Sequence, residues 1–172
     1  MPSLGSVEPE RIQGVVMFER CHSAHEVAYV YRGLGFAVSC FYGRVSLTAT
    51  PTLGAVAMPA GLGAQVRAHL EEESRWVAIP ILSYPRAQRE WVFLVGPAWG
   101  GKLGEHTIAQ LEERGVRILE SGQRVWLPMT DHPTGWYWVS QPLNAKTMPS
   151  RTSVIAVARQ FIASSELAAA WR

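Results

Sequence analysis

Hydrophobic and polar positions along this chain follow two periods, one typical of helices and one typical of strands. Apolar residues spaced three and four apart predict helices at 22–33, 62–73, 106–115 and 152–171. Runs rich in β-branched and aromatic residues predict strands at 36–41, 44–49, 53–59, 76–84, 89–97, 116–121, 124–129 and 134–142. This order favours an α/β (α+β) fold, with about four helices packed on a single mixed, largely antiparallel sheet.

The helix ends carry capping signals. Ser23 precedes the first helix and Glu26 follows three residues later, which is the spacing of a capping box. Ser150 or Ser153 is expected to cap the last helix.

The strand segments differ in their expected neighbours. Tight turns predict one hairpin at 36–49 and a second at 116–129. The short apolar run 53–59 is typical of a strand buried on both faces. Pro80 interrupts 76–84 and therefore indicates an edge-like or kinked strand.

Composition places the chain among globular proteins. It has 172 residues, of which 48% are hydrophobic and 17% charged, enough to bury a core. We expect a loose arm at 1–14 and a single globular domain at 15–172. No apolar run approaches the roughly 20 residues that span a bilayer, and acidic Glu8 and Glu10 do not suit a signal peptide. The expectation is a cytoplasmic protein with no membrane partner.

The residues near the first helix raise the question of a metal site. Cys21, His22, His25 and Cys40 include ligand types that zinc prefers, but no CxxC motif or second His pair completes a tetrahedral set. Two cysteines are also too few for a disulfide scaffold. We expect no metal and no cofactor, and binding of a metal by these four residues stays an open alternative.

Catalytic signals are sparse. Asp131 is the only aspartate, whereas two-metal phosphoryl transfer needs clustered carboxylates. There is no GxSxG elbow and no P-loop. Asp131 and His132 suit an acid–base pair, but the sequence Asp-His-Pro-Thr-Gly is equally typical of a turn. The pattern favours a protein that is not an enzyme.

One loop has the composition of a phosphate cradle. Gly100, Gly101 and Lys102 lie in the Gly-rich segment that precedes the third helix. The segment lacks P-loop spacing, so a flexible loop is the alternative interpretation.

Arginine and tryptophan are interleaved along the second half of the chain. The formal net charge is only +2, yet of 16 basic residues all but Lys102 and Lys146 are arginine. Arginine suits bidentate phosphate contacts, although a GC-rich genome also favours it. Arginine beside aromatic rings on a sheet is typical of single-stranded nucleic-acid binding. Strand alternation would instead bury about half of the tryptophans. The candidate contacts are Arg86, Arg89, Arg117, Arg124, Trp99, Trp136 and Trp138.

The pattern P-x-R, W-x-F-L-V, LP and W over about residues 54–162 resembles a group of small actinobacterial proteins. Their layout is similar to the N-terminal domain of bifunctional DNA primase/polymerases. The resemblance implies a palm-like domain in which active members hold metal with acidic residues on a central strand. The corresponding segment here, 53–59, has no carboxylate, so the resemblance implies a catalytically degenerate member.

The expected function is therefore non-catalytic nucleic-acid binding, with single-stranded DNA and a replication or mobile-element setting as the favoured context. In the stretch 83–101, Arg86 and Arg89 are expected to face solvent from a turn and Phe93 to lie in the core. The alternative is a protein-interaction or regulatory module that forms a homo-oligomer through exposed aromatic residues.

Overall fold

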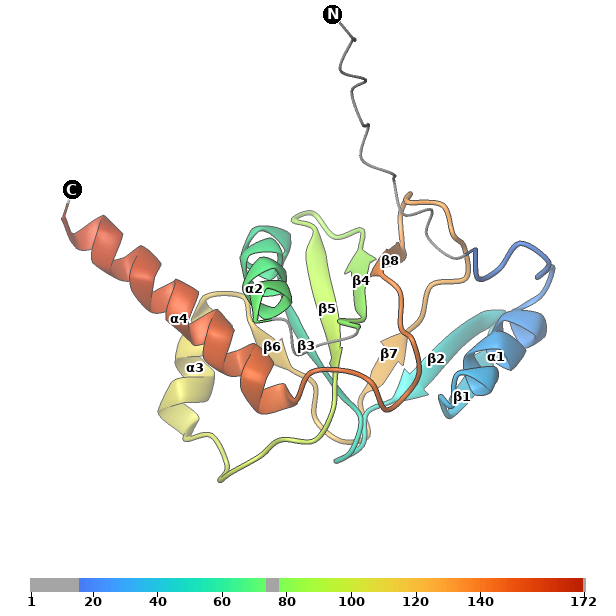
Figure 1. The fold of residues 1–172 in the computed structure, drawn as a ribbon, viewed down its shortest axis with the longest axis horizontal. Coiled ribbons are helices and arrows are strands. Elements are labelled where there is room, and N and C mark those ends of the chain that lie inside the picture. The colour runs from blue at the N-terminus through green and yellow to red at the C-terminus, as the bar shows by residue number, and fades with distance from the viewer. Residues whose placement is uncertain (1–15, 74–77, 172) are drawn as a thin grey trace, which may run out of the picture.

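The computed structural model describes residues 16–73 and 78–171 (Figure 1). The arm expected at 1–14 and part of the strand expected at 76–84 lie outside these residues. The described residues contain four helices: α1 (Ala24–Gly33), α2 (Ala60–Glu72), α3 (Glu105–Glu113) and α4 (Arg151–Ala170). The strands are β1 (Val38–Phe41), β2 (Arg44–Thr48), β3 (Gly54–Pro59), β4 (Ile81–Tyr84), β5 (Glu90–Val95), β6 (Arg117–Ile118), β7 (Arg124–Trp126) and β8 (Tyr137–Ser140). The mixed α+β fold class is confirmed.

The strands divide between two antiparallel sheets, where the sequence predicts one. The smaller sheet has the order β1-β2-β7, and the larger sheet has the order β6-β3-β5-β4-β8. The expected hairpin at 36–49 is confirmed by the pairing of β1 with β2. The second expected hairpin is wrong, because β6 pairs with β3 and β7 pairs with β2. The chain therefore crosses from one sheet to the other between these two strands.

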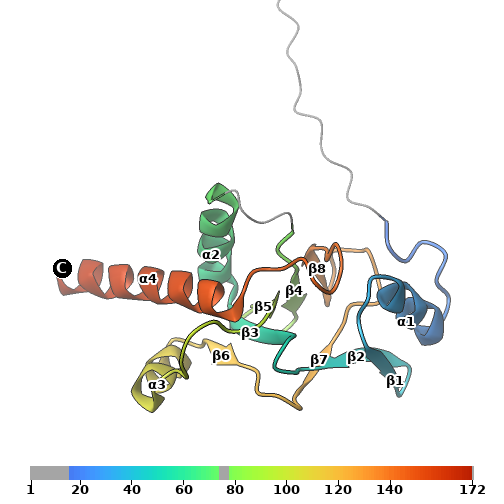
Figure 2. The same cartoon turned by 60° about the horizontal axis from the view of Figure 1, so that its bottom comes forward.

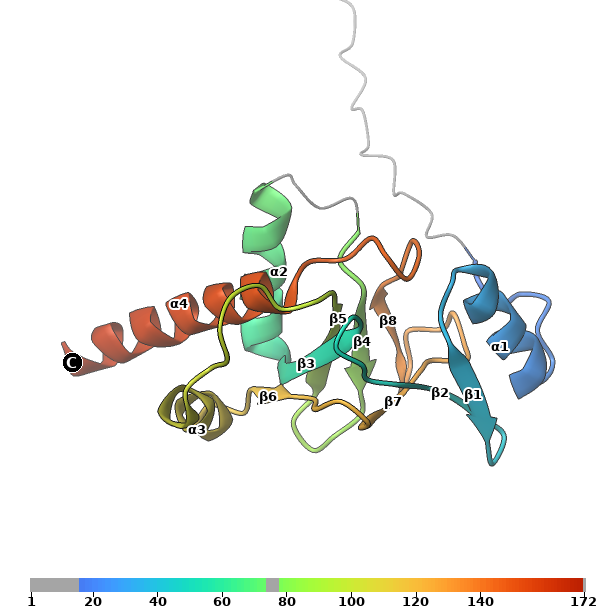
Figure 3. The ribbon, with the colours of Figure 1, turned by 90° about the horizontal axis from the view of Figure 1, so that it is seen from below.

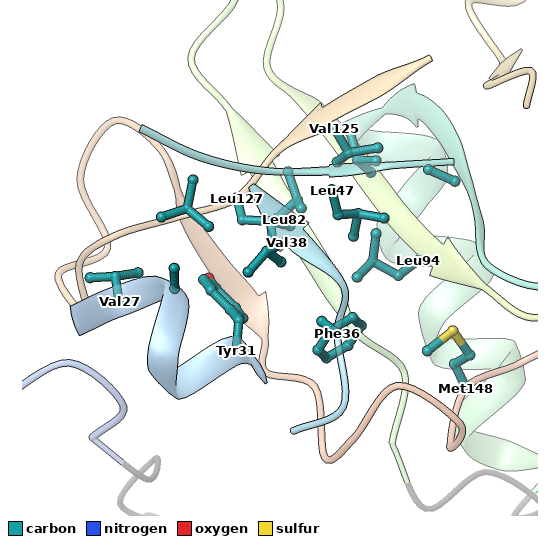
Figure 4. Packing of buried hydrophobic residues seen from close by; sticks show 14 of the residues in the cluster. Val27, Tyr31, Phe36, Val38, Leu47, Leu82, Leu94, Val125, Leu127 and Met148 are labelled. Carbon is teal, nitrogen blue, oxygen red and sulfur yellow. The ribbon is translucent and has the colours of Figure 1, made fainter. Parts of the chain in front are cut away.

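Both faces of the larger sheet are covered. Strand alternation sends Val56 and Phe93 into one core, which they share with residues of α2, α3 and α4. Ala57 and Leu94 point to the opposite face and pack with α1 and the smaller sheet, in the core that Figure 4 shows. The expectation that 53–59 is buried on both faces is confirmed.

Strand β4 occupies an interior position of the larger sheet. It lies between β5 and β8, so the edge-like alternative is wrong. The kinked alternative agrees with the register shift between Ile81 and Leu82 in the pairing of β4 with β8. Pro80 is accommodated because it directly precedes the strand, where its missing N–H is not needed. Its carbonyl still accepts a hydrogen bond from the Leu94 N–H, at 3.0 Å.

Tyr31 links α1 to Pro128 and to Trp138 of β8, within the core that Figure 4 shows. Its ring is fully buried between α1 and the smaller sheet (Figure 4). The hydroxyl donates to the Pro128 carbonyl at 2.6 Å and accepts from Trp138 Nε1 at 2.8 Å. Burial raises the pKa of Tyr31 far above its ordinary value of 10.

Both expected helix caps are present. The Glu26 N–H donates to Ser23 Oγ at 3.3 Å, and the Glu26 carboxylate accepts from the His22 N–H at 2.6 Å. This backbone hydrogen bond is the main reason that the pKa of Glu26 lies below its ordinary value. At α4, the Ser153 N–H donates to Ser150 Oγ at 3.1 Å, which assigns the cap to Ser150.

The last helix extends beyond the rest of the fold. The first half of α4 packs against α2 and the larger sheet, whereas residues 163–170 are exposed and project away from it (Figures 2 and 3). Within the described part of the chain, no helix is long and apolar enough to cross a bilayer.

Candidate functional site

A cleft of about 520 Å³ opens between the two sheets, and we name it the arginine cleft. Its walls combine guanidinium groups with aromatic rings, and its floor includes Ala57 and Val92 of the larger sheet. Four arginines face one carboxylate there, so the lining is strongly cationic. The functional groups come from Arg44, Arg86, Arg117, Arg124, Glu90, Tyr84, Trp126 and Trp136.

The smaller sheet contributes an arginine–aromatic face. Its register pairs Phe41 with Arg44 and places Trp126 and Arg124 on the same face as Arg44. The Arg124 Cζ lies 4.5 Å from the Phe41 ring centroid and 5.2 Å from the Trp126 ring centroid. Arg44 Cζ lies 6.0 Å from the ring centroid of Trp136. These cation–π contacts hold the guanidinium groups of Arg44 and Arg124 over the rings.

The larger sheet and the turn before β5 contribute a cluster of charged side chains to the cleft, formed by Arg86, Glu90 and Arg117. Arg117 Nη2 donates to both carboxylate oxygens of Glu90, at 2.9 and 3.0 Å. Arg86 Nε lies 3.5 Å from the same carboxylate. The Glu90 side chain is 12% exposed, against 60% for Arg86 and 48% for Arg117. A guanidinium has five N–H donors. Glu90 therefore holds two arginines in place and uses only a minority of their donors.

Two further rings form the aromatic wall. The rings of Tyr84 and Trp136 lie 5.6 Å apart, and the Tyr84 hydroxyl donates to the Trp126 carbonyl at 2.8 Å. Burial raises the pKa of Tyr84 well above 10, so this side chain stays neutral at ordinary pH.

Trp136 also holds a buried donor that is not used. Its Nε1 has no hydrogen-bond partner among the described residues. A buried donor without a partner costs about 1–3 kcal/mol.

Four of the candidates named from the sequence line the arginine cleft together: Arg86, Arg117, Arg124 and Trp136. They come from a turn, two strands of different sheets and the segment before β8. The structure thus joins residues that lie up to 50 positions apart in the chain.

Arg89 is exposed, as expected for the turn, but it lies outside the cleft lining. Its Nη1 donates to Ser83 Oγ and to the Gly135 carbonyl, both at 2.9 Å. Its Cζ also lies 5.4 Å from the Tyr137 ring centroid. Arg89 therefore braces the segment that leads into β8.

Trp138 packs against the core that contains Tyr31 and does not line the arginine cleft. Its indole donates to the buried Tyr31 hydroxyl, and its ring lies 6.3 Å from the Tyr31 ring. These contacts agree with the alternative interpretation of the tryptophans, in which some are buried by strand alternation.

The candidate phosphate loop lies elsewhere. The Trp99 N–H donates to Thr152 Oγ1 at 2.8 Å, which fastens the loop to the first turn of α4. Trp99 and Gly101 line a separate cavity of about 110 Å³ beside that helix. Neither Gly100 nor Lys102 lines the arginine cleft.

Asp131 has a structural role. Its two carboxylate oxygens accept hydrogen bonds from the Met17 and Phe18 N–H groups, at 2.9 and 2.7 Å. The neighbouring His132 N–H donates to Thr130 Oγ1 at 3.2 Å, as in a local turn. The only aspartate of the chain thus fastens the segment before α1.

The cysteines lie near α1. Cys40 Sγ lies 3.6 Å from the Ala24 carbonyl, to which it donates. Burial is the largest cause that raises the pKa of Cys21. Among the residues that the structure describes, no three His, Cys, Asp or Glu side chains gather where they could hold a metal ion.

The sequence interpretation missed Arg44, Glu90, Tyr84 and the role of Trp126. One signal for Arg44 was available, because alternation along β2 sends Val45 and Leu47 to the core and Arg44 to the opposite face. Glu90 follows Arg86 by four residues, but only the pairing of β6 with β3 brings Arg117 to the same carboxylate.

Comparison with known proteins identified no relative of this chain: no family model, curated protein or solved structure matches it significantly. The primase/polymerase resemblance stays a prediction from the sequence.

Proposed function

We propose that the arginine cleft binds single-stranded nucleic acid. The observation that carries this proposal is the gathering of four guanidinium groups and three aromatic rings in one cleft with a single carboxylate. Guanidinium groups suit phosphate oxygens. Aromatic rings suit unpaired bases, because every base has a face that can stack. Single strands present both chemistries along one backbone.

The position of the rings favours a single strand over a duplex. Trp126 and Trp136 are partly buried, so their rings belong to the cleft wall and not to an open convex surface. A base must leave its stack to reach such rings, and bases in a duplex are already stacked on their neighbours. The volume of the cleft also lies within the range of ordinary ligand sites, roughly 300–1,000 Å³.

The proposal assigns binding and no chemical step. Glu90, the carboxylate in the cleft lining, is held by Arg86 and Arg117. Two-metal phosphoryl transfer would need several carboxylates that are free to hold cations. A non-catalytic, primase/polymerase-like role in replication or on a mobile element is the part of the proposal that rests on the sequence resemblance alone.

One observation favours self-association as a second candidate function. Leu167 and Trp171 are 64% and 88% exposed at the projecting end of α4 (Figure 1). Exposed aromatic and aliphatic side chains of this kind can anchor a protein interface. This end of the helix lies outside the cleft lining, so both functions are compatible in one molecule.

Salt dependence and one arginine variant test the nucleic-acid proposal. Fluorescence anisotropy of a labelled single-stranded oligonucleotide should show affinity that falls with salt. Each neutralised phosphate contributes about −0.7 to the slope of log affinity against log salt, so four arginines allow a slope down to about −3. Arg86→Ala should weaken binding about five- to tenfold and make the slope shallower by about 0.7. The thermal stability of this variant should change little, because the Arg86 side chain is 60% exposed and Glu90 keeps its ion pair with Arg117.

Arg67→Ala is the matched control. Arg67 also forms a partly exposed ion pair with a glutamate four residues on, Glu71, but it lies on α2 outside the cleft lining. It should leave the affinity and the salt slope unchanged. Equal losses in both variants, or no salt-sensitive binding by the unsubstituted protein, would overturn the proposal.

A further inference from the structure

We propose that the tip of the β1–β2 hairpin extends the arginine cleft, so that the ligand is a strand of several nucleotides and not a mononucleotide. This inference rests on the proposed function and adds the length of the ligand and a second contact surface. The tip consists of Phe41, Tyr42, Gly43 and Arg44.

Tyr42 has no evident role in folding. It is 98% exposed, and its φ of 49° lies in the left-handed region. It is the only non-glycine residue with a positive φ in the described part of the chain. With Gly43 at φ 69°, the turn has the two positive φ angles typical of a type I′ hairpin. Asn, Asp or Gly is usual at the position that Tyr42 occupies in such a turn. A large exposed ring at a disfavoured backbone position therefore points to a contact outside the molecule.

The tip is continuous with the cleft through stacked side chains. The Phe41 ring is 45% exposed and lies 4.5 Å from Arg124 Cζ, which in turn lies 5.2 Å from the ring of Trp126. Arg124 and Trp126 both line the cleft, and so does Arg44 at the end of the turn. A row of alternating rings and guanidinium groups thus runs from the tip to the cleft wall.

This arrangement fits a strand whose bases and phosphates alternate with the same chemistry. A mononucleotide placed in the cleft would leave the exposed rings of Phe41 and Tyr42 unused. A longer strand would occupy both surfaces. The affinity should therefore rise with oligonucleotide length, and part of that rise should depend on the ring of Tyr42.

Oligothymidylates of about 3 and about 12 nucleotides separate the two surfaces. The unsubstituted protein should bind the longer strand more than tenfold tighter than the shorter one. Tyr42→Asn should weaken binding of the longer strand at least about fivefold, which is the lower end for one lost stacking contact. It should leave the shorter strand unaffected. Asn tolerates the left-handed region, so the hairpin itself should be at least as stable.

Two further variants complete the test. Tyr42→Phe keeps the ring and should retain the unsubstituted affinity. Tyr29→Ala removes another exposed tyrosine, which is 77% exposed on α1. Helix α1 packs on the face of the smaller sheet opposite to Arg44, so this variant should bind both strands normally.

The outcomes separate this inference from the proposed function. If both strands bind in a salt-sensitive manner but Tyr42→Asn binds the longer one normally, or Tyr29→Ala loses as much affinity, the hairpin surface is overturned and the cleft proposal stands. If neither strand binds, both are overturned.

Discussion

Replacing Phe93 by alanine is expected to lower the free energy of unfolding by about 3–5 kcal/mol, the range for a fully buried phenylalanine. Phe93 is completely buried at the centre of β5, where it pairs with Val56 on one side and Ile81 on the other. Its ring belongs to the core under α2 and α4. The surrounding strands are fixed on both sides, so the cavity has little freedom to collapse.

Urea unfolding followed by far-ultraviolet circular dichroism measures this loss. Phe41→Ala is the matched control, because the Phe41 ring is 45% exposed and contacts Arg124 rather than a core. It should cost no more than about 1 kcal/mol. Similar costs for the two variants would contradict the assignment of β5 to the centre of the core.

The free energy of unfolding should fall steeply above about pH 10 because of two buried tyrosines. Burial raises the pKa of Tyr31 and of Tyr84 in the folded state, whereas both ionise near 10 when the chain unfolds. The unfolded state then binds fewer protons than the folded state. Each tyrosine should remove about 1.4 kcal/mol per pH unit, and the two together about 2.7 kcal/mol. Below about pH 10 neither tyrosine should affect the dependence of the free energy of unfolding on pH.

Urea unfolding in steps from about pH 8 to about pH 11.5 gives the slope directly. In Tyr31→Phe the slope should be about half as steep. This variant is also less stable at neutral pH, because the Pro128 carbonyl and the Trp138 indole lose their partner. The slope is thus the informative quantity. A free energy of unfolding that stays constant above pH 10 would mean that these hydroxyls are not buried.

Local patterns in the sequence predict much of the fold. The cap at Ser23, the hairpin at 36–49 and the burial of 53–59 all depend on residues that are close together in the chain, and all three are present. The second hairpin was wrong for a physical reason. Alternation in 116–129 identifies two strands but not their partners, and β6 pairs with β3 of the larger sheet whereas β7 pairs with β2 of the smaller sheet.

The arginine cleft likewise could be predicted from the sequence only in part. Arg86, Arg117, Arg124 and Trp136 could be named from the chemistry of their side chains. Their association depends on the crossing of the chain between the sheets, which no local pattern records. Arg89 has the same side chain and a similar setting, yet it is engaged by Ser83 and the Gly135 carbonyl. Only the three-dimensional structure separates it from the others.

The position of bound nucleic acid is the central claim, and the indole N–H signals of the tryptophans test it most directly. A ¹H–¹⁵N spectrum should be recorded while a single-stranded oligonucleotide of about 12 nucleotides is added. The indole signals of Trp126 and Trp136, which line the cleft, should shift until the site is saturated. Those of Trp99 and Trp171, which are more exposed but lie outside it, should stay in place. Shifts confined to Trp99 or Trp171, or no shifts at all, would contradict the account.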